Sequence, residues 1–289
     1  MSIVPAKAAG VEQIAVVAPP RHNGDVHPTI LAVCQELGVN EVYRIGGAHA
    51  VAALAFGTAS IERVDKIVGP GGIYVQLAKK LVFGAVDIDN FAGPSEIVVI
   101  ADETADPRFV AIDLLAQAEH DPGSAILLTP DRSLAQAVQQ RVDQELDSLP
   151  RACGTRQSLE RFSAIVMTRN LDQAIELTNE LAPEHLQIQT RDAPSLAERC
   201  VNAGAIFVGE FTPEATGDYV AGPSHVLPTG GSARFFSGLS SNDFLHRTSV
   251  IRYDRRMLAA QAQAITTFAR AEGLEAHARS TEIRLSGKD

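Results

Sequence analysis

The chain has 289 residues, 45% of them hydrophobic and 21% charged, which is an ordinary composition for a soluble globular protein. Its formal net charge of −10 argues against nucleic acids and anionic membranes as partners, because both are bound by basic surfaces. The three cysteines form no C-x-x-C pair, so we expect a reducing, cytoplasmic setting without a thiolate zinc site. No apolar run reaches the ~20 residues of a membrane span, and no signal peptide is evident.

Short β-branched runs alternate with longer Ala- and Leu-rich segments over the first part of the chain. The pattern predicts strands at 12–20, 41–45 and 65–69 and helices at 28–38, 46–57 and 71–84. Repeated β-α-β units favour a mostly parallel sheet with helices on its faces.

The alternation restarts after a loop rich in Gly, Pro and Asp near 87–95, where we place a domain boundary. The later pattern predicts strands at 96–102, 125–130, 163–168, 185–190 and 205–209 and helices at 107–120, 134–149, 170–181 and 194–204. The sequence therefore predicts an α/β fold with two incomplete Rossmann-like parallel-sheet domains, residues 1–92 and 93–240.

The stretch 210–243 differs from the rest because it is dense in Gly, Pro, Ser and Thr and has no clear period. A long irregular stretch in a compact protein is usually a functional loop. After it, 249–254 resembles a strand, and 256–285 resembles two helices separated at Gly273. We interpret 241–289 as a small C-terminal helical arm.

Two pairs of polar residues stand out in the predicted second domain. Gln117 and His120 are three residues apart on a predicted helix, so they share a face and suit a common metal ion, or equally a polar last turn. Glu184 and His185 lie where a helix gives way to a strand and point to opposite faces, but both can flank one cleft. His, or a Glu whose pKa is raised by burial, can transfer protons near neutral pH, although a solvated loop pair is the alternative.

Further candidates lie in glycine-rich surroundings. Asp218 and His225 fall in the segment 217–231, where Gly and Pro can fix the backbone that carries polar side chains, unless it is a plain surface loop. Glu272 and His277 flank the helix break, which also suits an imidazole near a helix C-terminus. No G-x-G-x-x-G motif is present, so glycines alone give a weak cofactor signal.

Seven segments, in this order, resemble the histidinol dehydrogenase family. They are RIGGAHAVAALAFGT (44–58), IVGPGG (67–72), AGPSE (92–96), LAQAEH (115–120), APEHLQ (182–187), GDYVAGPSHVLPTGG (217–231) and EGLEAHARS (272–280). The similarity runs the length of the chain.

The resemblance implies a zinc-dependent, NAD-linked enzyme that oxidises L-histidinol to L-histidine through the aldehyde, for histidine biosynthesis. The positions that match the zinc ligands are Gln117, His120, Asp218 and His277. Glu184 and His185 match the acid–base pair, in which His185 takes the hydroxyl proton and Glu184 activates water at the aldehyde stage. The positions that match substrate contacts are Ser95, His225 and Glu272.

The resemblance also implies a homodimer, because the family's C-terminal segment reaches the neighbouring subunit's site, so that Glu272 and His277 would serve a partner chain. On the cofactor side, His49 stands where the family has Gln and Gly72 where it has Asn. Met1 leads directly into a stretch that is mid-chain in the family. We therefore expect an N-terminally shortened member with weak NAD binding or low stability.

Three other functions stay open. Ser224, where the family commonly has Asn, favours a paralogue that oxidises another small polar alcohol, such as a sulfonated diol. The altered cofactor side is also consistent with a truncated, weakly active zinc-binding module, although the retained Glu184 and His185 argue against it. A zinc hydrolase would use the same metal with an activated water and no NAD.

Overall fold

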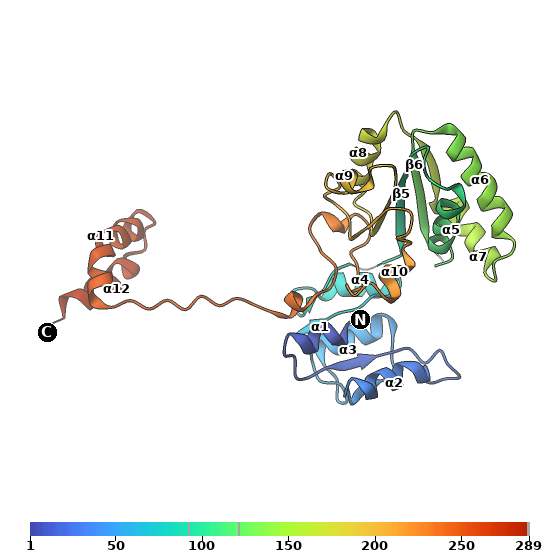
Figure 1. Ribbon diagram of the computed structural model, residues 1–289. Coiled ribbons are helices and arrows are strands. Elements are labelled where there is room, and N and C mark those ends of the chain that lie inside the picture. Colours follow the sequence, from blue (N-terminus) through green and yellow to red (C-terminus); the bar gives the residue numbers. More distant parts are fainter. Residues whose placement is uncertain (92, 121, 288–289) are drawn as a thin grey trace. The chain divides into compact units, whose positions relative to one another are not determined.

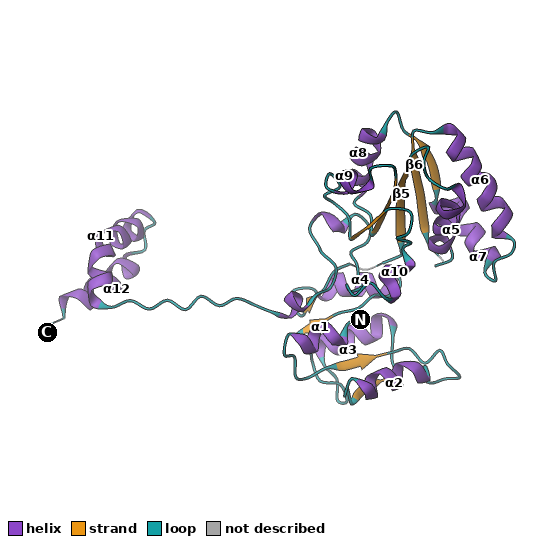
Figure 2. Cartoon of the chain, viewed as in Figure 1, coloured by secondary structure: helices purple, strands orange, loops and turns teal. Residues whose placement is uncertain are grey.

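Three parallel sheets organise the described part of the chain. The computed structural model describes residues 1–91, 93–120 and 122–287, and the chain divides into two compact units after residue 245. All three sheets lie in the first unit, and their strands pair in parallel throughout, with helices around them (Figures 1 and 2). The predicted α/β class with Rossmann-like parallel sheets is confirmed.

Two short sheets lie in the first ninety residues. The strands are β1 (Ala15–Val17) paired with β2 (Glu41–Tyr43), and β3 (Lys66–Ile67) paired with β4 (Asp87–Ile88). The helices are α1 (Ile3–Ala8), α2 (Pro28–Glu36), α3 (Gly47–Phe56) and α4 (Ile73–Val82). β1 covers the middle of the predicted stretch 12–20 and ends before the proline-rich loop, where Pro19 and Pro20 have no N–H for a strand ladder. An apolar cluster that includes Val51, Leu54 and Ile67 packs between the helices and strands.

The larger sheet has the strand order β7-β6-β5-β8-β9. Its strands are β5 (Glu96–Ala101), β6 (Ser124–Thr129), β7 (Ala164–Met167), β8 (His185–Gln189) and β9 (Ala205–Val208). The helices between them are α5 (Pro107–Ala118), α6 (Arg132–Leu146), α7 (Ala152–Phe162), α8 (Leu171–Leu181) and α9 (Ala193–Ala197). The central strand β5 is almost wholly apolar because helices cover both of its faces.

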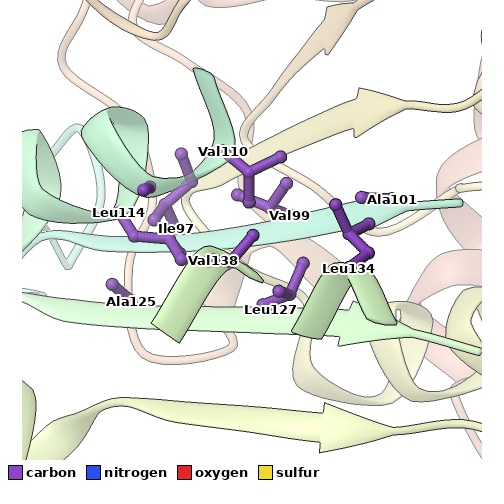
Figure 3. Close-up of a cluster of buried hydrophobic side chains, with 10 residues drawn as sticks. Ile97, Val99, Ala101, Val110, Leu114, Ala125, Leu127, Leu134 and Val138 are labelled. Atoms are coloured by element: carbon purple, nitrogen blue, oxygen red, sulfur yellow. The ribbon is translucent and has the colours of Figure 1, made fainter. Parts of the chain in front are cut away.

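Alternate residues of β5 face two different layers. Ile97 and Val99 pack against α5 and α6, where Leu114 lies over the sheet (Figure 3). Val98 and Ile100 face the opposite layer, which is built on α8 and α9. Burying each of these aliphatic side chains contributes about 1.5–3 kcal/mol, so the sheet is a stable base for residues at its edge.

The stretch 210–243 is mostly irregular, as predicted, and holds three short helical segments. These are α10 (Ala215–Tyr219), η1 (Ser232–Arg234) and η2 (Ser241–Phe244). Among the described residues, no helix has both the length and the apolar character that crossing a lipid bilayer requires.

The second unit is a pair of helices, α11 (Arg255–Ala271) and α12 (Glu275–Ser286), that pack against each other. They are separated at Gly273, whose φ of 75° suits glycine, as predicted. The strand predicted at 249–254 is wrong. Its β-branched residues Val250 and Ile251 are 90% and 79% exposed, and no strand pairs with them in the described chain. β-branched composition favours extended backbone, but a strand also needs a neighbour.

Candidate active site and metal centre

The predicted acid–base pair lies at the amino end of β8. Ala182, which is buried and has left-handed backbone (φ 49°), ends α8 and turns the chain toward the strand. Glu184 and His185 follow and are only 6% and 3% exposed. This edge is opposite to the carboxyl ends of the strands, where ligands of open α/β sheets usually bind.

Glu184 is bound to the start of the central strand. Its Oε2 accepts a hydrogen bond from the Glu96 amide at 3.0 Å, while Oε1 of Glu96 accepts from the Glu184 amide at 3.3 Å. Burial raises the pKa of the Glu184 carboxyl to about 8, although the Glu96 amide and the Ser95 side chain both lower it. A substantial fraction of Glu184 is therefore protonated at neutral pH.

The His185 ring is oriented through its Nδ1 atom. Nδ1 lies 3.2 Å from the carbonyl oxygen of Glu96 and 3.7 Å from a carboxyl oxygen of both Glu184 and Glu214. The Glu96 carbonyl can only accept, so when Nδ1 carries the proton it donates there, and Nε2 is left able to accept a proton. Burial lowers the pKa of His185 to about 4, more than the Asp218 carboxylate raises it, so the ring is neutral.

Three side chains that can bind a metal ion lie next to this pair. One ligand atom each from His120, Glu214 and Asp218 lies within 4.8 Å of the others. An imidazole nitrogen and carboxylate oxygens form a donor set that fits zinc. His120 follows the end of α5 in a turn, so the predicted shared helical face with Gln117 is wrong, because the helix stops at Ala118.

Gln117 is fully buried beside the same group. The surrounding acceptors assign the amide nitrogen to the side of Glu214, where it donates to Oε2 at 3.0 Å and lies 3.3 Å from Oε1 and 3.2 Å from Nδ1 of His185. Burial, together with the charges of Asp218 and Asp113, raises the pKa of Glu214 to about 8. Gln117 thus contacts Glu214, which lies with His120 and Asp218, and the roles of these residues as metal ligands stay predictions.

A cavity of about 690 Å³ opens onto these residues, a volume that suits a small ligand. His185, Asp218 and His225 line it, and Nδ1 of His225 lies 3.3 Å from the backbone oxygen of Asp218. Apolar side chains such as Phe207 and Leu227 line other parts of its wall. The cavity therefore combines proton-transfer groups with an apolar wall.

Two glycines allow the backbone at the site to pack closely. A Cβ added at Gly204 would lie 2.6 Å from the carbonyl oxygen of Glu184, and one added at Gly123 would lie 2.1 Å from that of Gln117. No side chain fits at such distances, so both positions require glycine.

The predicted cofactor residues lie at helix N-termini in the first ninety residues. His49 is exposed on the first turn of α3, and Gly72 precedes α4 with open space around its α-carbon. A buried ion pair between Lys79 and Asp89 holds the loop before α4, because the Lys79 Nζ donates to the Gly69 carbonyl at 3.0 Å and the Gly69 amide donates to Asp89 at 2.7 Å.

Glu272 and His277 lie in the second unit. Glu272 ends α11, His277 lies in the first turn of α12, and both are exposed. Their assigned roles in substrate and metal binding stay predictions.

Sequence reasoning missed several buried polar residues around the site. Glu214 is four residues before Asp218, the spacing of one helical turn, but the segment was treated as irregular. On β8, His185 alternates with Gln187 and Gln189, whose amides both donate to Asp113 of α5 at 2.7 and 3.0 Å. Polar residues at every second position of a buried strand were a signal that could have revealed this contact between β8 and α5.

Comparisons with known proteins place the chain in one family. The family model for histidinol dehydrogenase matches residues 1–285. The histidinol dehydrogenase of Rhodopirellula baltica is 56% identical over 98% of this chain and 62% of its own length, and that of Geobacillus kaustophilus is 53% identical over 99% and 68%. The crystal structure of histidinol dehydrogenase from Elizabethkingia anophelis matches with a TM-score of 0.92 and 38% identity, over 99% of this chain and 66% of that one. The chain spans about two thirds of the length of these relatives, and it belongs to the histidinol dehydrogenase family.

Proposed function

We propose that this chain catalyses the zinc-dependent, NAD-linked oxidation of L-histidinol to L-histidine, through the aldehyde, in histidine biosynthesis. Family membership supports the substrate and the pathway. The observation that carries the proposal is the buried Glu184–His185 pair beside the group of His120 and Asp218, with His185 and Asp218 lining one cavity.

The donor set supports zinc as the metal. Gln117, His120 and Asp218 would hold it, together with His277 contributed by a neighbouring copy of the chain. When bound, zinc would supply an electrophilic centre and a template for the imidazole and amine of the substrate. Substrate contacts are proposed for Ser95, His225 and, from the neighbouring copy, Glu272.

His185 and Glu184 carry the proton transfers. In the first oxidation, His185 accepts the hydroxyl proton at Nε2 while its Nδ1 proton stays directed at the Glu96 carbonyl. In the second, deprotonated Glu184 removes a proton from the water that attacks the aldehyde carbon. When bound, NAD supplies the hydride acceptor for each step, so one substrate yields two NADH. A Cβ added at Gly47, near His49, or at Gly72 would meet nothing within 4 Å, and this space at the starts of α3 and α4 suits its phosphates.

We also propose a homodimer and a reducing, cytoplasmic location. The dimer follows from the roles of Glu272 and His277 toward a neighbouring copy. The location is supported by the three free cysteines, of which Cys34 and Cys200 are buried.

The test combines metal analysis with product stoichiometry. We expect the purified chain to contain about one zinc per protomer and to form two NADH per L-histidinol. Glu184→Gln should slow oxidation of the aldehyde, and Glu180→Gln, an exposed carboxylate on α8, should have no effect. A zinc-loaded chain that forms no NADH from histidinol, or that turns over without NAD, would overturn the proposal.

A second candidate is the oxidation of another small polar alcohol. Ser224 lies beside His225 in the cavity wall, where it can alter which substrate fits. Turnover of a sulfonated diol in preference to L-histidinol would favour this candidate.

A further inference from the structure

Glu214 has no role in the reaction as described, although it touches two residues that do. It is 5% exposed and lies just before α10. Its carboxylate contacts the Gln117 amide nitrogen at 3.0 Å and lies 3.7 Å from Nδ1 of His185. We propose that Glu214 is a positioning residue that fixes the Gln117 carboxamide and the His185 ring, and that it is not itself a metal ligand. This inference rests on the proposed function of the site.

The first argument is the direction of the Gln117 amide. A carboxamide has one donor end and one acceptor end. Because the Glu214 carboxylate accepts from the nitrogen, the carbonyl oxygen of Gln117 is turned to the other side, where it is available as a ligand. Without Glu214, a rotation of the amide by half a turn would direct the nitrogen, which cannot ligate a metal, to that position.

The second argument is depth. Among the three ligand types that lie together, Glu214 is buried, Asp218 is half-buried and His120 is exposed. Both carboxylate oxygens of Glu214 are within 3.3 Å of the Gln117 nitrogen. Glu214 therefore lies deeper than Asp218 and His120, in a position from which supporting residues commonly orient metal ligands.

The third argument concerns His185. The same carboxylate lies near its Nδ1, on the side where the Glu96 carbonyl oxygen also lies. Glu214 therefore contacts the ring directly and also through the Gln117 amide nitrogen, which lies 3.2 Å from Nδ1. One side chain connects the orientation of a metal ligand with that of the general base.

The test measures metal affinity without substrate. Removing a supporting residue typically reduces metal affinity or activity about 10–100-fold, and we expect this loss for Glu214→Ala. Glu214→Gln should stay within about tenfold of the unsubstituted chain, because its carbonyl oxygen can still accept from Gln117. Glu210→Gln, at an exposed carboxylate four residues earlier, is the matched control and should change nothing. Thermal melting of each variant is the control that checks whether the fold is retained.

A reciprocal exchange tests the contact directly. Gln117→Glu places two carboxylates against each other and should weaken zinc binding, whereas Gln117→Glu combined with Glu214→Gln restores a donor–acceptor pair and should recover at least part of the loss. The absorption spectrum of the cobalt-loaded Glu214→Gln variant should be the same as that of the cobalt-loaded unsubstituted chain, since the metal ligands are unchanged.

Three results would overturn the inference. The first is an altered cobalt spectrum in Glu214→Gln. The second is a loss of zinc affinity in Glu214→Gln as large as that in Asp218→Asn. The third is unchanged zinc affinity in Glu214→Ala. Failure of the proposed function is distinguishable, because it appears as a zinc-loaded chain that forms no NADH, while the coupling between positions 117 and 214 is measured without substrate.

Discussion

At the scale of single residues, burial determines the chemistry of the site. Glu96, Asp113, Glu184 and Glu214 all lie in one region of the interior, and burial raises the pKa of each carboxyl group. His185 responds in the opposite direction, because burial disfavours its charged form. The pair at the start of β8 is therefore neutral near pH 7, with the imidazole ready to accept a proton and the carboxyl group largely holding one.

This arrangement predicts a different pH dependence for the two oxidation steps. Glu184 acts as a base only when deprotonated, and its pKa is raised to about 8. Oxidation of the aldehyde should therefore rise about tenfold per pH unit well below pH 8 and level off above it. Rates measured with the aldehyde as substrate from pH 6 to 10 check this. Glu184→Gln should be slow and lack the rise, and an unsubstituted chain with a flat profile over this range would contradict the assignment.

At the scale of elements, the site depends on how closely neighbouring segments approach. β8 contacts the turn before β9 at Gly204, and α5 contacts the turn before β6 at Gly123. Each glycine lies against the carbonyl of a functional residue, Glu184 in one case and Gln117 in the other. The two turns therefore help to set the backbone positions of Glu184 and Gln117, and the Ala205 amide also donates to the Glu184 carbonyl at 2.9 Å.

We expect Gly204→Ala to reduce activity although it removes no functional group. The added methyl group would lie 2.6 Å from the Glu184 oxygen, so the backbone must shift. Overpacking of this kind costs about 1–3 kcal/mol of stability, measurable by urea unfolding. Gly287→Ala, where the added atom meets open space, is the control. Equal activity and stability in the two variants would contradict this account.

The long elements were predictable from the sequence, and the short ones were not. The apolar period and the caps identified β5, β8 and α5, because a buried strand or helix must be apolar where it packs. The two-residue strand β4 is too short for any period to show. The extended segment at 249–254 has strand composition, but pairing is a property of the neighbours, which composition does not contain.

The sequence could suggest members of the candidate site but not their contacts. Family resemblance singled out Glu184, His185, His120 and Asp218, and their roles stay predictions. Glu214 could not be assigned without coordinates, since its role depends on which side chain it faces across the sheet edge.

At the scale of the whole molecule, the proposed homodimer can be tested at the start of the second unit. Residues 246–254 are irregular, and the apolar side chains of Val250 and Ile251 are 90% and 79% exposed. If the second unit docks on a neighbouring copy, as proposed, we expect this apolar segment to be covered.

We therefore expect tryptic cleavage after Arg247 and Arg252 to slow as protein concentration rises through the dimer range, because docking would protect the segment. Mass spectrometry of timed digests measures this. Val250→Asp should weaken docking and remove the concentration dependence. Cleavage at the same rate at all concentrations would argue against the proposed homodimer.

The proposed reacting groups lie at the amino edge of the sheet, and the opposite rim lies away from them. β5 has six residues, which at ~3.3 Å each separate the two rims by about 20 Å. At that rim Arg191 is solvent-exposed, and its backbone amide is held by Asp102 at 2.9 Å. A fluorescent dye or a surface anchor attached there would report on or immobilise the enzyme without obstructing the substrate.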